Sequence, residues 1–395
     1  MTDTNTVKQT LKTLVLSNVS TILWGPPGIG KTTGVRDLAA ELEAPLYEII
    51  PATREPADFG GYPVPEDGVI RLRPVGDWVR FAERAELAAR DEKIAILFID
   101  EVAGCTLAQQ NALLRVTLDK VVGEFPLPSN VCVVCAANPV DQSAGGWELS
   151  AAFSNRLAHL DWPVPTVEDW VAWLLAQPAE DPAGMYARHL VAGFLSARPT
   201  LLLALPPGDT DRGRAWPSPR SWRACTKALA RVAGHAKGAQ LVEEGGAVAR
   251  ATVGIAAAAG FVEMLRGVEL IDPEELLANP ALWDERVMRS CADGDGLVRA
   301  WSALVAVMAT LLSAKLDNGK ITKARWFAAW EIHRRARLSQ LDGGALSGAT
   351  VAALGIPLGI AALHAKEGRP AGPAHELPMP EEAFAAVKVR QSAEA

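Results

Sequence analysis

Two patterns of hydrophobic residues divide the chain into different parts. Up to about residue 165, short β-branched runs are separated by stretches in which apolar residues recur at helical spacing. The expected strands are Thr21–Trp24, Leu46–Ile50, Ile94–Ile99, Val131–Ala137 and His159–Trp162. The expected helices are Thr32–Leu42, Asp77–Arg90, Leu107–Leu118 and Glu148–Arg156. Because strands and helices alternate, this part is predicted to be an α/β fold, a parallel sheet flanked by helices.

The rest of the chain has a helical pattern. From Thr166 onward the strand signal nearly vanishes, and Ala, Leu, Trp and Arg recur at helical spacing. Loops rich in proline and glycine interrupt this pattern at Leu205–Pro219 and Ile271–Pro280. The last 29 residues, from Glu367, contain four prolines and end in a helix-competent piece, Pro380–Arg390. We therefore expect a helical second part with a flexible tail that carries a docking element.

Composition and charge narrow the classes of function. At about 150 residues per domain, a chain of 395 residues is expected to form two to three domains. With 49% hydrophobic and 22% charged residues, the chain is expected to be globular rather than disordered or collagen-like. The net charge of −7 gives no overall attraction to nucleic acid or anionic lipid, so such binding would need a local basic patch.

Neither a redox site nor a membrane segment is expected. Five cysteines in so long a chain indicate reduced thiols. Cys132 and Cys135 lie in an expected strand, where positions three apart face opposite sides, so we expect core packing. The uncharged stretch of 23 residues from Gly343 to Ala365 contains five glycines and Pro357, which favours broken buried helices over a membrane span. The first residues contain no apolar signal-peptide core, and we expect a cytoplasmic protein.

A glycine-rich loop follows the first expected strand and precedes a helix. Residues Gly25–Thr32 read G-P-P-G-I-G-K-T and fit the phosphate-binding pattern G-x-x-x-x-G-K-[ST]. In such a loop, backbone N–H groups surround the phosphates and the following helix points its positive end at them. Lys31 is expected to reach the β- and γ-phosphates of ATP, and the Thr32 hydroxyl to ligate Mg²⁺. The expected nucleotide contacts are Gly25, Pro26, Pro27, Gly28, Ile29, Gly30, Lys31, Thr32 and Thr33.

Two further strands end in residues suited to nucleotide hydrolysis. The apolar run before Asp100 and Glu101 predicts a buried strand that delivers both carboxylates to the ligand edge of the sheet. Asp100 is expected to hold Mg²⁺, directly or through water, and Glu101 to polarise the attacking water. Asn138 follows the next apolar strand and can orient that water without adding charge. By itself, however, an Asn-Pro pair is more typical of the start of a turn.

These motifs resemble those of the AAA+ ATPases, and among them the MoxR-like group. MoxR-like proteins have a G-x-P-G-x-G-K-T loop, matched by Gly25–Thr32, and a Q-N-A-L-L helix, matched by Gln110–Leu114. Their N-P…Q…G…L…A…R segment is matched by Asn138, Pro139, Gln142, Gly145, Leu149, Ala152 and Arg156. The resemblance covers about residues 15 to 165 well and fades beyond about 265. It departs at Val102–Cys105, which reads V-A-G-C in place of I-N-R-A, and at Asn155 and Leu157, which replace Asp and Phe beside the arginine.

The resemblance implies an organisation and roles for single residues. The implied parts are an AAA+ α/β nucleotide-binding core over residues 1–165, an α-helical lid over 166–265, and a helical carboxyl-terminal extension with a flexible tail over 266–395. Asn138 corresponds to sensor 1, and Arg156 to an arginine finger that reaches the ATP of a neighbouring subunit. A surface salt bridge is the alternative for Arg156. Arg220, in a P-S-P-R segment, corresponds to sensor 2 at the entrance of a lid helix.

The implied activity is Mg²⁺-dependent ATP hydrolysis in a homo-oligomeric ring, expected to be a hexamer because the finger needs a neighbour. The implied work is chaperone-like remodelling or activation of a partner protein, of the von Willebrand factor A or metal-binding type. One alternative is a nucleic-acid motor or restriction-type NTPase subunit, although the guanine-reading N-K-x-D motif is absent. The other is a nucleotide-controlled scaffold with little turnover, which the presence of Glu101, Asn138 and Arg156 disfavours.

Other features of the sequence lie outside these motifs. The pair Asp67–Gly68 between extended residues predicts a hairpin. In MoxR-like proteins a hairpin at this place faces the pore of the ring, so Tyr62 and Val64 would touch substrate; plain packing of the hairpin is the alternative. Lys320–Arg337 predicts an amphipathic helix with a solvated basic face rather than a nucleic-acid site. Six scattered histidines show no ligand spacing, so no metal is expected beyond Mg²⁺ with the nucleotide.

Overall fold

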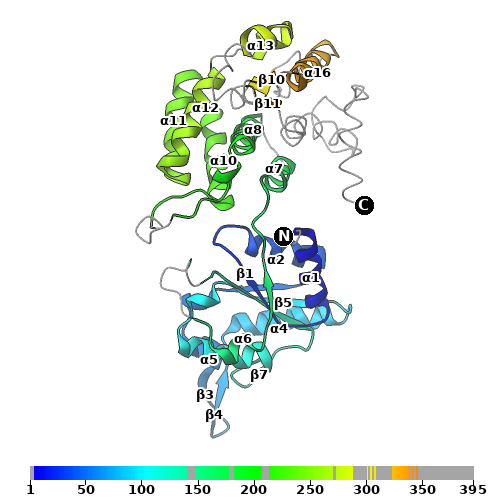
Figure 1. The fold of residues 1–395 in the computed structure, drawn as a ribbon. Helices are drawn as coiled ribbons and strands as arrows, with labels where there is room; N and C mark the ends of the chain where they lie inside the picture. The colour runs from blue at the N-terminus through cyan, green and yellow to red at the C-terminus, as the bar shows by residue number, and fades with distance from the viewer. Residues whose placement is uncertain are drawn as a thin grey trace. The chain divides into compact units, whose positions relative to one another are not determined.

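The computed structural model describes residues 4–139, 142, 148–177, 182–206, 213–269, 273–287, 300, 303–304, 307, 323–338, 340–341 and 344–345. The chain divides into two compact units, Met1–Pro165 and Thr166–Ala395 (Figure 1). No helix among the described residues is long and apolar enough to cross a membrane. Gly145, most of the uncharged stretch Gly343–Ala365 and the tail from Glu367 lie outside the described residues.

A five-stranded parallel sheet forms the centre of the first unit. Its strands are β1 (Thr21–Trp24), β2 (Leu46–Ile49), β5 (Ala95–Ile99), β8 (Val131–Ala137) and β9 (Ala158–Asp161). They lie in the order β2-β5-β8-β1-β9, and every neighbouring pair is parallel. All residues of β5 and β8 are buried, as expected for continuous apolar runs in strands covered on both faces. The predicted α/β fold is therefore confirmed, and each predicted strand is present to within one residue at either end.

Helices flank this sheet (Figure 1). The helices and 3-10 turns of the first unit are α1 (Thr4–Leu16), α2 (Lys31–Glu41), η1 (Pro51–Thr53), α3 (Pro56–Gly60), α4 (Gly76–Ala89), η2 (Val102–Gly104), α5 (Leu107–Leu118) and α6 (Ala151–Ser154). Trp78 and Phe81 of α4 and Leu113 and Val116 of α5 share one buried cluster with side chains of β5 and β8. α1 contacts β8, and α2 contacts β5. This packing fixes the carboxyl ends of β1, β5 and β8, where the predicted site residues follow.

The helix predicted over Glu148–Arg156 is wrong in extent, because only the four residues of α6 are helical. The side-chain amide of Gln110, which is 1% exposed, forms hydrogen bonds through both its oxygen and its nitrogen to the backbone that precedes α6. Its Oε1 accepts from the N–H of Ser150 at 2.9 Å, and its Nε2 donates to the carbonyl of Glu148 at 3.2 Å. These bonds hold the chain extended, so the helix cannot begin earlier. Arg156 consequently lies on a turn after α6 and not at a helix end.

A two-stranded hairpin, β3 (Tyr62–Glu66) and β4 (Val69–Arg73), projects from the first unit (Figure 1). Asp67 and Gly68 have φ angles of 49° and 80°, as a two-residue type I′ turn requires, so the predicted hairpin is confirmed. Its base contacts a smaller hairpin, β6 (Val121–Val122) and β7 (Phe125–Pro126), where Glu124 N donates to Leu72 O at 3.0 Å. Five large apolar side chains of the hairpin are 36 to 69% exposed, namely Tyr62, Val64, Val69, Ile70 and Leu72. These side chains therefore lie at the surface and do not pack into the core.

The C-x-x-C sequence of β8 belongs to the core. Cys132 and Cys135 have no exposed surface, and neither forms a disulfide. Burial raises the pKa of Cys132 to about 12 and also raises the pKa of Cys135. Because a thiol that stays protonated is a poor nucleophile and metal ligand, the predicted packing role is confirmed.

The second unit is helical in its described residues, apart from the two-residue strands β10 (Gln340–Leu341) and β11 (Gly344–Ala345). Its helices and turns are α7 (Val167–Ala176), α8 (Pro182–Ala197), η4 (Pro199–Leu201), α10 (Pro219–Ala233), α11 (Gly238–Val253), α12 (Ile255–Glu269), α13 (Pro273–Ala278), the π-helical turn η5 (Trp283–Val287) and α16 (Lys323–Leu338). Trp222 of α10 packs against Phe194 and Phe261 in the centre of this unit. Gly246 lets α11 approach α12, because a Cβ atom there would lie 2.6 Å from Val262 Cγ2. The predicted helical character of this part is confirmed.

The basic helix α16 is engaged within its own unit. Arg325 Nη2 lies 2.7 Å from a carboxylate oxygen of Glu274 in α13, and Arg335 forms an ion pair with Asp284 in η5. Two of its positive charges are thus compensated by carboxylates of the same unit.

Candidate nucleotide site

The glycine-rich loop joins β1 to α2 at the carboxyl edge of the sheet. Gly28 and Gly30 have φ angles of 80° and 104°, a backbone region that residues with a Cβ atom rarely adopt. α2 begins at Lys31, directly after the loop, and the N–H groups of a first helical turn have no acceptor within their helix. The local sequence therefore builds a turn that is suited to bind an anion.

Lys31 joins this loop to the end of β8. Its side chain is buried, and Nζ donates to the carbonyl oxygens of Gly25 at 2.6 Å and Pro26 at 3.0 Å. Nζ also donates to Oδ1 of Asn138 at 2.7 Å. Because β8 lies next to β1 in the sheet, two residues that are 107 positions apart meet at the same edge. The structure thus brings together the lysine of the loop and the asparagine predicted from the second apolar strand.

Thr32 and Asp100 form a second connection across the same edge. The Thr32 hydroxyl donates to Asp100 Oδ2 at 2.6 Å, and Asp100 Oδ1 accepts from the N–H of Glu101 at 2.9 Å. A hydroxyl and a carboxylate are the hard oxygen ligands that Mg²⁺ prefers, so these two residues fit the ion that ATP brings. The described residues contain no group of three or more His, Cys, Asp or Glu placed to hold a metal. This donor set suits Mg²⁺, which usually binds through phosphates and few protein ligands.

Glu101 has an unusual backbone conformation. It is exposed, with φ 59° and ψ 39°, in the left-handed region that non-glycine residues seldom occupy. This conformation costs about 1–2 kcal/mol and persists where the surrounding structure requires it, often at functional sites. Here it turns the chain sharply after buried β5 and leaves the Glu101 carboxylate at the surface beside Asp100.

Arg156 lies near the amino ends of the strands, whereas the phosphate loop lies at their carboxyl ends. Ala158, the first residue of β9, pairs in parallel with Thr21, the first residue of β1, whereas the phosphate loop follows the last residue of β1. The turn that carries Arg156 is anchored by Phe153 and Leu157, which are both buried. Among the described residues, Arg156 Nη1 is buried without a hydrogen-bond partner, and no ion pair of this guanidinium is found. The salt-bridge alternative therefore has no partner in that part of the chain.

Arg220 belongs to the second unit. It is exposed and follows Pro219, the first residue of α10, whose amino end is capped by Ser218 accepting from Ser221 N at 3.1 Å. The predicted placement at the entrance of a helix is confirmed, while the role of Arg220 toward a nucleotide stays a prediction.

Two residues in or next to β9 make contacts with β1 and α2 that the sequence did not predict. The ring of Trp162 is buried against α2, since a Cβ atom at Gly34 would lie 2.4 Å from it. The backbone N–H of Trp162 donates to the backbone oxygen of Trp24 at 2.7 Å. His159 accepts a hydrogen bond from the indole of Trp24, the residue before the phosphate loop. No sequence signal could have found these contacts, because the pairing of β1 with β9 creates them.

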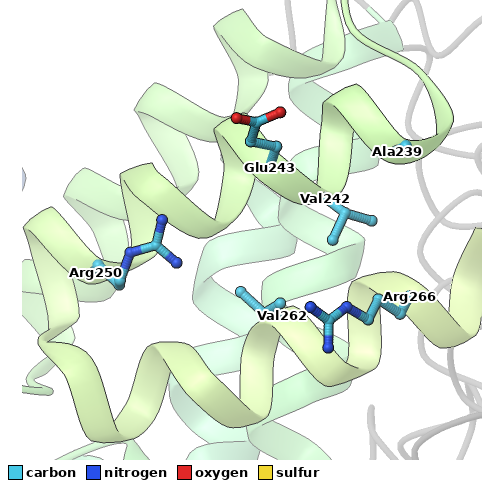
Figure 2. Close-up of a pocket in the computed structure, with 6 residues that line it drawn as sticks. All are labelled: Ala239, Val242, Glu243, Arg250, Val262 and Arg266. Atoms are coloured by element: carbon cyan, nitrogen blue, oxygen red, sulfur yellow. The ribbon is translucent and has the colours of Figure 1, made fainter.

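The second unit contains a separate pocket of about 400 Å³ between α11 and α12 (Figure 2). Its lining residues are Ala239, Val242, Glu243, Arg250, Val262 and Arg266. Figure 2 shows the two arginines on either side of Val262, with Glu243 on the neighbouring helix. Arg266 also lies 3.5 Å from Glu263, so the charges around the pocket are mixed and favour neither an anionic nor a cationic ligand.

Comparison with known proteins finds a family match within the first unit. Residues 21–145 match the family described as ATPase family associated with various cellular activities (AAA). The similarity to this family is confined to these residues of the first unit. The matched range includes Lys31, Thr32, Asp100, Glu101 and Asn138. No curated protein matches the sequence.

The chain is similar to several solved structures at low sequence identity and low TM-score. NtrX from Brucella abortus in complex with ADP is 17% identical, with a TM-score of 0.37 over 78% of this chain and 63% of that chain. Two mutants of RuvB from Thermotoga maritima are 15% and 16% identical, with TM-scores of 0.36 and 0.37. The alignments with RuvB cover 83% and 78% of this chain and 89% and 83% of those chains. This chain spans less than two thirds of the NtrX chain, and at these values the likeness carries no information on activity.

Proposed function

We propose that this protein is an ATP-hydrolysing AAA+ ring ATPase of the MoxR-like kind, which remodels or activates a partner protein in a chaperone-like way. The observation that carries the proposal is the meeting of Lys31, Asn138 and the Thr32–Asp100 pair at one edge of the sheet, with Glu101 beside them. This set includes a cation for the phosphates, oxygen ligands for Mg²⁺, a base and a neutral amide. Transfer of a phosphoryl group to water needs these groups.

In the proposed reaction, the loop and Lys31 bind the β- and γ-phosphates of ATP. Mg²⁺, held by Thr32 and Asp100, would neutralise charge on the phosphates. Glu101, exposed beside Asp100, accepts the proton of the attacking water. Asn138, within hydrogen-bond distance of Lys31, orients that water beside the γ-phosphate.

The position of Arg156 supports an assembly of several subunits. Because this arginine lies at the sheet edge opposite to its own phosphate loop, we assign it to the ATP of a neighbouring subunit. Its Nη1, which has no hydrogen-bond partner in the described part of the chain, supports a contact that another chain completes. A finger donated from subunit to subunit fits a head-to-tail interface that closes into a ring, for which we propose a hexamer in the cytoplasm. Arg220 is assigned to sensor 2 of the same subunit, in a lid that spans residues 166–265 and precedes an extension over 266–395.

The hairpin β3–β4 is the surface to which we assign the partner protein. Five exposed apolar side chains on two short strands are more than scattered surface hydrophobes, and such patches often mark protein contacts. Partners of the von Willebrand factor A or metal-binding type are proposed from the MoxR-like resemblance alone.

Replacing Ile70 by Asp should remove partner binding without changing the nucleotide site. Ile70 is 69% exposed on the hairpin, and burying such a side chain in an interface contributes about 1.5–3 kcal/mol. Glu101→Gln should trap the ATP-bound ring with its partner, so a pull-down with this variant measures capture. Capture should fall about tenfold or more when Ile70→Asp is added. Leu87→Asp, at a side chain that is 57% exposed on α4, is the matched control and should capture normally. Equal capture by both variants would remove the hairpin from the proposal.

Replacing Arg220 by Ala should weaken the response to ATP within the same subunit. In mixed rings, the loss of turnover should rise linearly with the mutant fraction, because sensor 2 acts on its own nucleotide. Arg231→Ala, exposed near the other end of α10, should behave as wild type. Unchanged ATP affinity and turnover in Arg220→Ala would show that this residue has only a surface role.

Steady-state ATPase activity with and without duplex DNA separates the alternatives. A ring that acts on proteins should hydrolyse ATP at a rate that DNA leaves unchanged. Stimulation by DNA would favour a nucleic-acid motor, and absence of turnover in the wild type would favour a scaffold.

A further inference from the structure

His159, in β9, contacts one residue at the carboxyl end of β1 and another in the segment that precedes the amino end of β9. Its Nδ1 accepts from Trp24 Nε1 at 2.9 Å, and its Nε2 lies 3.0 Å from the carbonyl oxygen of Ser154. Trp24 is the last residue of β1 and directly precedes Gly25 of the phosphate loop. Ser154 is the last residue of α6, just before the turn that carries Arg156. One side chain therefore touches elements at both ends of the strands.

The two partners fix the state of the imidazole. The indole N–H of Trp24 can only donate, so Nδ1 must carry the lone pair. The carbonyl of Ser154 can only accept, so the proton lies on Nε2. The planes of the two rings are 21° apart, which suits a hydrogen bond in the plane of both. Both ring nitrogens of His159 are thus satisfied, although the side chain is exposed.

The carbonyl that His159 holds is the one that closes the turn around Arg156. Ser154 O also accepts from Leu157 N at 3.2 Å, and Asn155 and Arg156 lie inside that hydrogen-bonded turn. A movement of this carbonyl would change the direction of the turn. At the other end, Trp24 is bound into the sheet through β8 and β9, so it is a rigid anchor.

We propose that His159 is a positioning residue for the arginine finger, which it sets by tying the Arg156 turn to the strand that leads into the phosphate loop. The inference rests on the proposed role of Arg156 in a neighbouring subunit. His159 does not touch the nucleotide in this arrangement. Its effect should therefore appear at the neighbouring ATP and not in its own subunit.

Mixed rings test this assignment by placing the change in only one of two subunits. Arg156→Ala subunits keep their base and hydrolyse ATP only with a finger from a Glu101→Gln neighbour. His159→Ala is then added either to the Glu101→Gln finger donor or to the Arg156→Ala subunit. On the donor, turnover should fall between about twofold and tenfold, as the loss of a hydrogen bond of about 0.5–1.5 kcal/mol predicts. On the hydrolysing subunit, turnover should not change.

The outcomes separate the proposed finger role of Arg156 from the proposed positioning role of His159. An equal loss from both placements would show that His159 acts on its own nucleotide site, and no loss from either would show that it does nothing for the finger. Both results overturn the inference while the finger itself stands. No activity in the mixture of Arg156→Ala with Glu101→Gln would overturn the finger, and the inference with it.

Two conservative variants test separately the hydrogen bonds of His159 to Trp24 and to Ser154. His159→Asn retains an acceptor near the position of Nδ1 for Trp24, and His159→Gln retains a donor near Nε2 for Ser154. Because the connection needs both ends, each variant on the finger donor should lose as much turnover as His159→Ala. Trp24→Phe, which removes the indole donor, should give the same loss. Binding of a fluorescent ATP analogue to each donor, measured in parallel, should stay within about twofold of Glu101→Gln alone. Full turnover with either His159→Asn or His159→Gln contradicts the two-ended connection.

Discussion

Lys31→Ala should abolish nucleotide binding, whereas Glu101→Gln should bind ATP normally and lose most of its turnover. Lys31 supplies a positive charge at the loop, and loss of charge-assisted hydrogen bonds of about 1.5–3 kcal/mol each predicts affinity lower by about a hundredfold or more. Glu101→Gln keeps the shape of the side chain but removes the base, which contributes about 10²–10⁴ in rate. Titration with a fluorescent ATP analogue measures binding, and phosphate release measures turnover.

Two exposed residues of the first unit give matched controls for these variants. Lys8→Ala on α1 and Glu86→Gln on α4 change the same side-chain types away from the loop, and both should behave as wild type. Hydrolysis by Glu101→Gln at the wild-type rate would show that another group is the base. Tight binding by Lys31→Ala would show that the loop does not hold the phosphates through this lysine.

Arg156→Ala should leave ATP binding nearly intact and lower the rate of ATP hydrolysis about 10³-fold or more, because a finger stabilises charge that develops in the transition state. Mixing Arg156→Ala with Glu101→Gln should restore activity, since some interfaces then combine an intact base with an intact finger. The turnover of the mixture should exceed the sum of the two inactive parents and fall on dilution, as rings dissociate. Arg84→Ala, an exposed arginine on α4, should keep wild-type activity in the same assay.

A finger that acts within its own subunit predicts the opposite behaviour. Turnover per subunit would then be constant from nanomolar to micromolar protein, and mixing would restore nothing. That result would contradict the proposed ring assembly and favour the scaffold alternative. Sedimentation of the wild type with ATP, measured over the same concentrations, would show whether assembly and activity change together.

Local sequence was sufficient to predict most elements of the first unit. The strands β5 and β8 could be predicted because a short, continuous apolar run is typical of a strand that is covered on both faces of a sheet. The hairpin was found because Asp67–Gly68 is one of the few pairs that tolerate two positive φ angles. The helix around α6 was overestimated, since its extended approach is imposed by Gln110, a residue that lies about 40 positions earlier in the chain.

The sequence by itself determined the chemistry of the candidate nucleotide site, because the loop motif and the polar residues at strand ends depend on local backbone geometry and on residue type. Only the tertiary structure decided which of these groups meet. Lys31 reaches Asn138 because β8 lies beside β1. Thr32 reaches Asp100 because α2 packs against β5, on the far side of β8 from β1. The order of strands also placed Arg156 at the far edge and joined His159 to Trp24. Contacts of this kind arise from packing between distant segments, which no periodicity in a single chain can record.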